Sequence, residues 1–194
     1  MMDLVYPQSP ARLERGAVRG DASEMLPIVD INGVVLSQAP RSFCHGDGGG
    51  GGLAHLHPTV HVHLIDRQAR IYLQKRSETK KQFPGMWDTA VGGHVTYGEY
   101  VRETLYREAG EEIGLFDFSP VPLEPYLWES GTEKELVFPF AAVGSFALRP
   151  DGDEVSEGRW WTIPEIESSL GAGVFTANFE FEFARFAQSL LNLL

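Results

Sequence analysis

One predicted helix constrains the fold more than any other segment of the sequence. Within residues 98–113, Val101, Leu105 and Ala109 form an i, i+4 row of apolar side chains, which suits a helix that packs on a β-sheet. Gly114 follows this row and is expected at the C′ position, where glycine commonly ends a helix. The rest of the chain must therefore provide a sheet for this helix to cover.

The last turn of the same helix concentrates carboxylates. Glu108, Glu111 and Glu112 are spaced i, i+3, i+4, so a helix brings all three to one face. They repel one another and oppose the negative end of the helix dipole, which costs roughly 0.3–1 kcal/mol for each exposed charge. One explanation is a solvated acidic helix end. The other is a divalent cation, and ligands that are all oxygen indicate Mg²⁺ or Mn²⁺.

The segments around this helix have the patterns of strands and of two further helices. Asn32-Gly33 lies between apolar runs and predicts a β-hairpin. Periodicity and turn residues predict further strands over 59–65, 71–73, 87–95, 126–128, 136–147 and 160–162, and helices over 164–170 and 179–193, the last with Asn178 as N-cap. Strands on both sides of one helix, followed by C-terminal helices, indicate an α+β fold rather than a series of βαβ units.

Composition and charge limit the class of protein. The chain has 194 residues, of which 43% are hydrophobic, so we expect a single domain, which we place over 24–194. We also expect a flexible tail over 1–23 and a surface loop at the glycine run 48–52. The formal net charge of −11 argues against a surface built for the nucleic-acid backbone. The N-terminus has no apolar stretch typical of a secretory signal, no apolar run is long enough for a membrane span, and one cysteine fits a reducing compartment. We therefore expect a cytoplasmic protein.

The glutamates belong to a longer pattern, which reads Gly93-x5-Glu99-x7-Arg107-Glu108-Ala109-x-Glu111-Glu112-x-Gly114-Leu115. This run resembles the signature of the Nudix hydrolases at every fixed position. The one soft departure is Ala109, where the family has a bulkier aliphatic residue. The resemblance implies a Nudix-type α/β/α sandwich with a mixed β-sheet. It also implies that water attacks a phosphorus atom of a nucleoside diphosphate linked to another group.

The resemblance assigns roles to residues of the pattern. It implies that the three glutamates of the helix end bind the metal, which is Mg²⁺ with Mn²⁺ as the alternative, and take part in catalysis. Gly93 would offer its backbone carbonyl to the same metal, because a side chain there would block close approach. Arg107 and Glu99 match the structural pair that braces the loop and the helix.

Residues outside the pattern resemble the Nudix branch nearest to isopentenyl-diphosphate isomerase, which shifts a double bond instead of cleaving a diphosphate. The resemblance is carried by Phe83-Pro84-Gly85-Met86-Trp87-Asp88, Gly92-Gly93-His94, Arg76, His57 and Glu133-Lys134-Glu135. It implies substrate binding by Arg76, Phe83 and Trp87, metal binding by His94 and Glu133, and a catalytic role for Glu135. Whether His57 and His94 bind a second metal stays open. Two departures argue against isomerase activity. Gly92 stands where the isomerase needs a cysteine, and the Glu-Glu end of the pattern, which is eroded in isomerases, is complete in this chain.

Two groups of side chains outside these patterns stay open. His61 and His63 alternate along one strand, and we expect them on a half-exposed sheet surface rather than on a metal. Glu133 and Glu135 are candidates for the general base or for a further metal ligand. Glu154 and Glu157, in an acidic loop, are also possible bases, and the assignment of the base stays open.

The sequence therefore predicts a Mg²⁺-dependent Nudix hydrolase that cleaves the diphosphate linkage of a nucleoside diphosphate derivative or a related organic pyrophosphate. Two alternatives remain: an isomerase-like enzyme that acts on a prenyl diphosphate, and a Nudix-fold module that senses a nucleotide without turnover. The expected partner is a small diphosphate molecule, with no nucleic acid and no membrane. The leaving group is not identified, and a homodimer is an open alternative because dimers are common in proteins of this kind.

Overall fold

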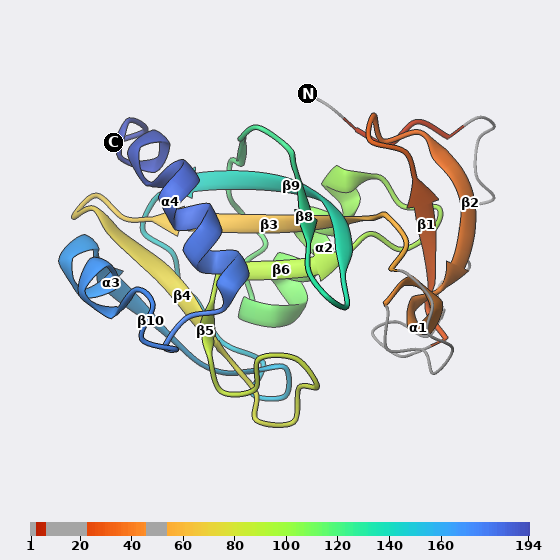
Figure 1. Cartoon of the computed structure of the whole chain (residues 1–194). Helices are drawn as coiled ribbons and strands as arrows, with labels where there is room; N and C mark the ends of the chain where they lie inside the picture. Colours follow the sequence, from red (N-terminus) through yellow and green to blue (C-terminus); the bar gives the residue numbers. More distant parts are fainter. Residues whose placement is uncertain (1–2, 7–22, 46–53) are drawn as a thin grey trace. The chain divides into compact units, whose positions relative to one another are not determined.

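The computed structural model describes residues 3–6, 23–45 and 54–194 (Figure 1). The described chain forms two compact units. Unit 1 comprises the described parts of 1–60 together with 93–105 and 123–139, and unit 2 comprises 61–92, 106–122 and 140–194. Most of the predicted tail and the glycine run at 48–52 lie outside the described residues. The division into a tail and one domain stays a prediction.

Strands dominate the first part of the described chain, and helices close it. The order is β1 (Met25–Val29), β2 (Val35–Pro40), α1 (Arg41–Cys44), β3 (His57–Ile65), β4 (Arg70–Arg76), β5 (Trp87–Asp88), β6 (Val91–His94), α2 (Val101–Ile113), β7 (Val121–Pro122), β8 (Tyr126–Glu129), β9 (Lys134–Val143), β10 (Val155–Thr162), α3 (Ile163–Ser169) and α4 (Ala177–Leu191). The predicted α+β class is confirmed.

The described strands form a small and a large sheet. β1 and β2 pair antiparallel on either side of Asn32-Gly33, which confirms the predicted hairpin. Gly33 has a φ of 77°, a backbone conformation that glycine adopts without strain. The large sheet has eight strands in the order β10-β4-β3-β9-β7, with β5 beside β4, β6 beside β3 and β8 beside β9.

Unit 1 includes the few described residues of the predicted tail. Leu4 is buried, and Val5 forms a β-bridge with Val34. The Tyr6 hydroxyl donates to the carbonyl of Glu99 at 3.0 Å and accepts the backbone N–H of Gly98 at 2.9 Å. These contacts tie residues 3–6 to the loop that precedes α2.

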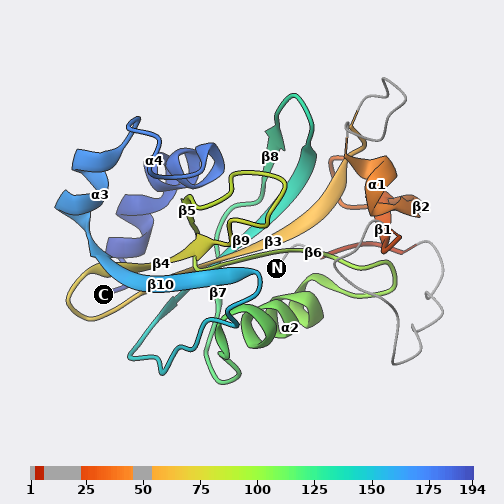
Figure 2. The ribbon, with the colours of Figure 1, turned by 90° about the horizontal axis from the view of Figure 1, so that it is seen from below.

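Unit 2 has helices on both faces of its strands (Figure 2). Leu64 of β3 pairs with Tyr72 of β4, and side chains alternate along a strand, so His63 and Gln74 lie on opposite faces. Gln74 contacts Glu112 of α2, whereas His63 contacts α4. This arrangement of α2 residues 106–113, strands and α4 is the predicted α/β/α sandwich.

The start of α4 corrects one prediction. The sequence predicted Asn178 as the N-cap, but the helix begins at Ala177, and the Thr176 hydroxyl accepts the backbone N–H of Phe179 at 3.1 Å. Thr176 is buried and also donates to Asp88 Oδ1 at 2.8 Å. A tertiary contact therefore selects the cap. No helix within residues 3–6, 23–45 and 54–194 has the length and apolarity that crossing a bilayer requires.

Candidate active site

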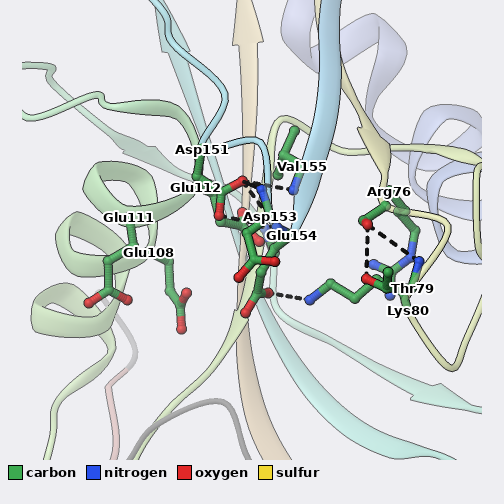
Figure 3. Close-up of polar contacts among 12 residues, drawn as sticks. Arg76, Thr79, Lys80, Glu108, Glu111, Glu112, Asp151, Asp153, Glu154 and Val155 are labelled. Atoms are coloured by element: carbon green, nitrogen blue, oxygen red, sulfur yellow. Dashed lines mark hydrogen bonds and ion pairs between the residues drawn. The ribbon is translucent and has the colours of Figure 1, made fainter.

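The three glutamates at the end of α2 have different surroundings (Figure 3). The Glu112 side chain is buried, Glu108 is 15% exposed, and Glu111 is 57% exposed. Arg107 Nη1 lies 2.7 Å from Glu108 Oε1 and 3.0 Å from Glu111 Oε2. The Glu111 carboxylate points away from Glu112 and Glu154. One helix turn thus supplies the buried carboxylate of Glu112, the half-buried carboxylate of Glu108, which Arg107 contacts, and the exposed carboxylate of Glu111.

Glu112 is the buried carboxylate of this group. Its Oε2 accepts the side-chain amide of Gln74 at 3.2 Å and the backbone N–H of Gly92 at 3.1 Å. Burial raises the pKa of Glu112 well above its usual value, and the charges of Glu108 and Glu154 raise it further. A cation would stabilise the ionised form against both effects. The oxygen donors here fit a hard divalent ion such as Mg²⁺.

The loop before β10 brings a further carboxylate to this region of unit 2. The Asp151 side chain accepts the backbone N–H groups of Glu154 at 3.2 Å and Val155 at 2.9 Å. The backbone N–H of Asp151 donates to the carbonyl of Glu112 at 3.0 Å. The Glu154 carboxylate forms a close ion pair with Lys80 Nζ. Figure 3 shows this loop between α2 and the Lys80 side chain. The turn around Asp151 therefore fixes Glu154 to the end of α2.

Unit 1 contains a second group of side chains that can bind a metal. One ring nitrogen from each of His45, His57 and His94 lies within 4.8 Å of the others. Glu135 Oε1 is 3.9 Å from Nε2 of both His57 and His94, and Glu133 Oε1 is 3.6 Å from His45 Nδ1. His57 Nε2 is buried with no hydrogen-bond partner in the described chain, and burial lowers the pKa of His57 to about 3. This imidazole is neutral, which is the form that binds metals.

His45 is the member of this group that sequence reasoning missed. It directly follows α1, a four-residue helix that no periodicity predicted, and it precedes the glycine run. The available signal was a histidine beside a loop rich in glycine, far in sequence from His57 and His94. Glu133 and Glu135, predicted as metal ligand and catalytic residue, lie with these histidines in unit 1.

The prediction for His61 and His63 is wrong, because both side chains are buried. His61 Nδ1 lies 2.9 Å from Glu182 Oε1, and His63 Nε2 lies 3.2 Å from Glu182 Oε2. Thr89 Oγ1 donates to the same Oε2 at 3.3 Å. Burial acts to raise the pKa of Glu182, but the charges and hydrogen bonds of the two histidines outweigh it and hold the pKa well below its usual value. Sequence reasoning missed Glu182, since the phenylalanines around it indicate only a core helix.

The residues predicted to bind substrate have structural partners in unit 2. Arg76 donates to Asp88 Oδ2 at 3.2 Å and to the carbonyl of Gln82 at 3.1 Å. Phe83 lies in a turn and has a φ of 50°. Trp87 meets Trp161 edge to face, with ring centroids 5.2 Å apart. A substrate role for Arg76, Phe83 and Trp87 stays a prediction.

The first two residues of the pattern, Gly93 and Glu99, lie in unit 1. Gly93 is in β6, and its role as a carbonyl ligand stays a prediction. Glu99 Oε2 accepts the Thr104 hydroxyl at 2.9 Å, which ties the loop before α2 to the first turns of the helix.

Known proteins resemble the chain in sequence and in fold. The NUDIX domain family model matches residues 55–179. An uncharacterised Nudix hydrolase of Rhodococcus erythropolis is 34% identical over 164 residues, covering 77% of this chain and 83% of that protein. An isopentenyl-diphosphate Delta-isomerase of Streptomyces griseus is 30% identical over 187 residues, covering 89% of each. The crystal structure of a Deinococcus radiodurans protein matches with a TM-score of 0.69 and 22% identity, covering 84% of this chain and 98% of that one.

Proposed function

Because the chain belongs to the Nudix family, we propose that it is a hydrolase that cleaves the diphosphate linkage of a nucleoside diphosphate derivative or a related organic pyrophosphate with the help of Mg²⁺ or Mn²⁺. The observation that carries the proposal is the buried Glu112, whose neighbours Glu108 and Glu154 add negative charge. The net charge of −11 supports a small molecule rather than nucleic acid as the partner. We also propose that the protein works in the cytoplasm.

The carboxylates of unit 2 would have different roles in the reaction. Glu108 and Glu112 would hold the cation, and Arg107 keeps Glu108 in place through its 2.7 Å contact. When bound, a divalent cation neutralises charge on the diphosphate and makes a water molecule more acidic. Gly93 is proposed as a further ligand through its carbonyl. Glu111, which is 57% exposed, would act at the rim of the site.

Glu154 is the residue that we propose as the general base. It is close enough to Glu112 to raise the pKa of that group, and Asp151 fixes its backbone. It would accept a proton from the water whose oxygen forms the new bond to phosphorus while the bridging P–O bond breaks. Glu135, one of the residues that the sequence left open as the general base, lies beside the histidines of unit 1.

The test is a release assay with purified protein against nucleoside diphosphate sugars, dinucleotides, coenzyme A and ADP-ribose, with Mg²⁺, Mn²⁺ and chelator in parallel. We expect cleavage of one class that stops with chelator, and ¹⁸O from labelled water on a phosphorus of the product. Glu112→Gln should lower kcat by about a hundred-fold, whereas Glu167→Gln on α3 should not change it. Full turnover in Glu112→Gln would refute the metal assignment. Binding of a nucleotide without turnover in the wild type would favour the sensing module.

One observation favours a second candidate function, an isomerase-like enzyme that acts on a prenyl diphosphate. The grouping of His45, His57 and His94 supports a second metal in unit 1, and the Streptomyces griseus relative carries the name of such an isomerase. Gly92 opposes this function, since glycine offers no acid for protonating a double bond. Exchange of deuterium from D₂O into isopentenyl diphosphate would support the isomerase, and the absence of exchange would leave the hydrolase.

A further inference from the structure

The hydroxyl of Tyr72 is a polar group to which the proposed hydrolysis gives no role. Tyr72 lies in β4 and is 4% exposed, and burial raises the pKa of its phenol above the usual value. Its hydroxyl has no hydrogen-bond partner among residues 3–6, 23–45 and 54–194. Polar groups inside proteins are nearly always hydrogen-bonded, because an unpaired one is unfavourable. A water molecule or a ligand must therefore supply the partner.

Two residues of β10 hold the phenol ring in one orientation. Trp160, which pairs with Tyr72, meets the ring edge to face, with ring centroids 5.4 Å apart. Two positions earlier in β10, a Cβ built at Gly158 would collide with the Tyr72 hydroxyl and with the carbon that carries it. Glycine inside a strand weakens the strand, and it often marks a place that another group approaches closely. Gly158 thus makes room for the Tyr72 hydroxyl over β10.

The hydroxyl lies beside the residue that holds Glu112. Gly158 pairs with Gln74 of β4, so the Tyr72 hydroxyl is over the position directly opposite Gln74. Side chains of paired residues share one face of a sheet, and their Cβ atoms are about 5 Å apart. Gln74 donates its side-chain amide to Glu112 Oε2 at 3.2 Å. Tyr72, Gln74 and Glu112 therefore meet on one face of the strands of unit 2.

A diphosphate bound on this face needs hydrogen-bond donors. Both printed hydrogen bonds to the Glu112 carboxylate end on Oε2, so Oε1 remains for the cation. The cation binds some phosphate oxygens, but ionised carboxylates nearby only accept hydrogen bonds and cannot bind the others. Lys80, whose charge acts to lower the pKa of Glu112, is already paired with Glu154. The Tyr72 phenol is a donor on the same face, and its raised pKa keeps it protonated at neutral pH.

We propose that Tyr72 is a substrate-binding residue whose hydroxyl donates a hydrogen bond to a phosphate oxygen of the diphosphate that the cation holds at Glu112. The proposal rests on the proposed function, because it needs the diphosphate at that cation. A hydrogen bond to a charged oxygen is stronger than one between neutral groups, and the phenol gives up no partner in the described chain to form it. Tyr72 recognises the diphosphate itself, so its contribution is the same for every organic part.

Calorimetry on Tyr72→Phe at pH 8 with Mg²⁺ tests the proposal. The probes are methylenediphosphonate, an uncleavable diphosphate with no organic part, and α,β-methylene-ADP, which has one. Tyr72→Phe should weaken the binding of both probes by about ten-fold, the value of one lost hydrogen bond to a charged group. The metal-free Tm should not fall, because the hydroxyl that is removed has no partner in the described chain.

Tyr106→Phe is the matched control. The Tyr106 hydroxyl donates to the carbonyl of Phe118 at 3.3 Å, so this variant removes a hydroxyl that the fold itself uses. It should lower the metal-free Tm by a few °C and leave the affinity for both probes unchanged. An equal loss of affinity in Tyr106→Phe and Tyr72→Phe would overturn the assignment of Tyr72, as would an equal loss of Tm.

Gly158→Ala tests the position of the hydroxyl rather than its presence. The added Cβ collides with the Tyr72 hydroxyl and displaces it. We expect about ten-fold weaker binding of both probes. The double variant with Tyr72→Phe should bind no more weakly than Tyr72→Phe alone, because the hydroxyl is then absent. A further ten-fold loss in the double variant would show that Gly158 acts independently of the hydroxyl and would overturn the inference.

The two probes separate failure of this inference from failure of the proposed function. Unchanged binding of both probes in Tyr72→Phe overturns the inference and leaves the proposed function standing. Weaker binding of α,β-methylene-ADP alone also overturns it, because the hydroxyl then contacts the organic part. If methylenediphosphonate does not bind even the wild type with Mg²⁺, the proposed function itself fails.

Discussion

Burial determines how Glu112 responds to pH and to metal. Its pKa is raised in the folded chain above the usual 4.5, so the folded state holds this proton more tightly than the unfolded state. Without metal, the group therefore destabilises the folded protein increasingly as the pH rises above 4.5. A divalent cation removes this effect because it stabilises the ionised carboxylate.

Thermal unfolding at pH 7.5 tests this prediction. Glu112→Gln should raise the metal-free Tm, by about 2–4 °C for each kcal/mol of relieved destabilisation. The same variant should lose the rise in Tm that Mg²⁺ gives the wild type. A lower metal-free Tm in Glu112→Gln would mean that the ionised carboxylate stabilises the fold by itself.

Glu182 shows the opposite response to pH. Its pKa is depressed in the folded state, so the stability that it contributes is fully present above the unfolded value of 4.5 and is lost as the pH falls below it. Glu182→Gln should cost about 3 kcal/mol in the free energy of unfolding at pH 7. Urea denaturation at pH 7 and pH 3 should show that the difference between wild type and variant narrows in acid. A difference that is the same at both values would refute the ion pairs with His61 and His63.

At the scale of elements, the N-cap of α4 provides a direct test of the structure against the sequence pattern. Thr176→Ala removes the hydroxyl that accepts the Phe179 N–H and should cost about 1 kcal/mol in the free energy of unfolding. Asn178→Ala lies inside the helix, where alanine is the better helix former, and should cost less. Chemical denaturation of both variants measures the difference. The reverse order of stability would restore Asn178 as the cap.

Local patterns predicted the elements that local physics controls. The hairpin at Asn32-Gly33 and the helix that ends just before Gly114 depend on turn geometry and on an apolar row, both of which are visible in the sequence. The spacing of Glu108 and Glu112 is likewise a property of one helix. The pattern could not show that Glu111 turns to the rim, because that depends on Arg107.

Contacts between distant segments explain what the sequence could not predict. Glu182 reaches His61 across 121 positions of the chain, and neither residue alone differs from an ordinary surface or core residue. His45 joins His57 and His94 because α1 and the segment after it bring it there. Tertiary pairing of this kind leaves no periodic signal within one element.

At the scale of the whole molecule, the two units have different donor atoms. The carboxylates of unit 2 suit Mg²⁺ or Mn²⁺, whereas the imidazoles of unit 1 suit Zn²⁺. His45→Ala should weaken Zn²⁺ binding by about 10–100-fold, measured by calorimetry on metal-free protein. His55→Ala is the control, since the His55 ring stacks on Phe43, with centroids 4.6 Å apart, and the backbone carbonyl that contacts His57 is kept. Equal losses in both variants would argue against a defined site at His45.

The buried thiol of Cys44 can report how often unit 1 opens locally. Cys44 is the one cysteine of the chain, it is packed with Leu26 and Ala39, and burial raises its pKa to about 11. A thiol reagent can modify Cys44 only after the hairpin region opens, so the labelling rate measures the frequency of opening at this one residue. Since His45 is the next residue, a metal bound there would keep the hairpin region closed and lower the labelling rate. One colorimetric trace would then report the dynamics of unit 1 separately from any chemistry at Glu112.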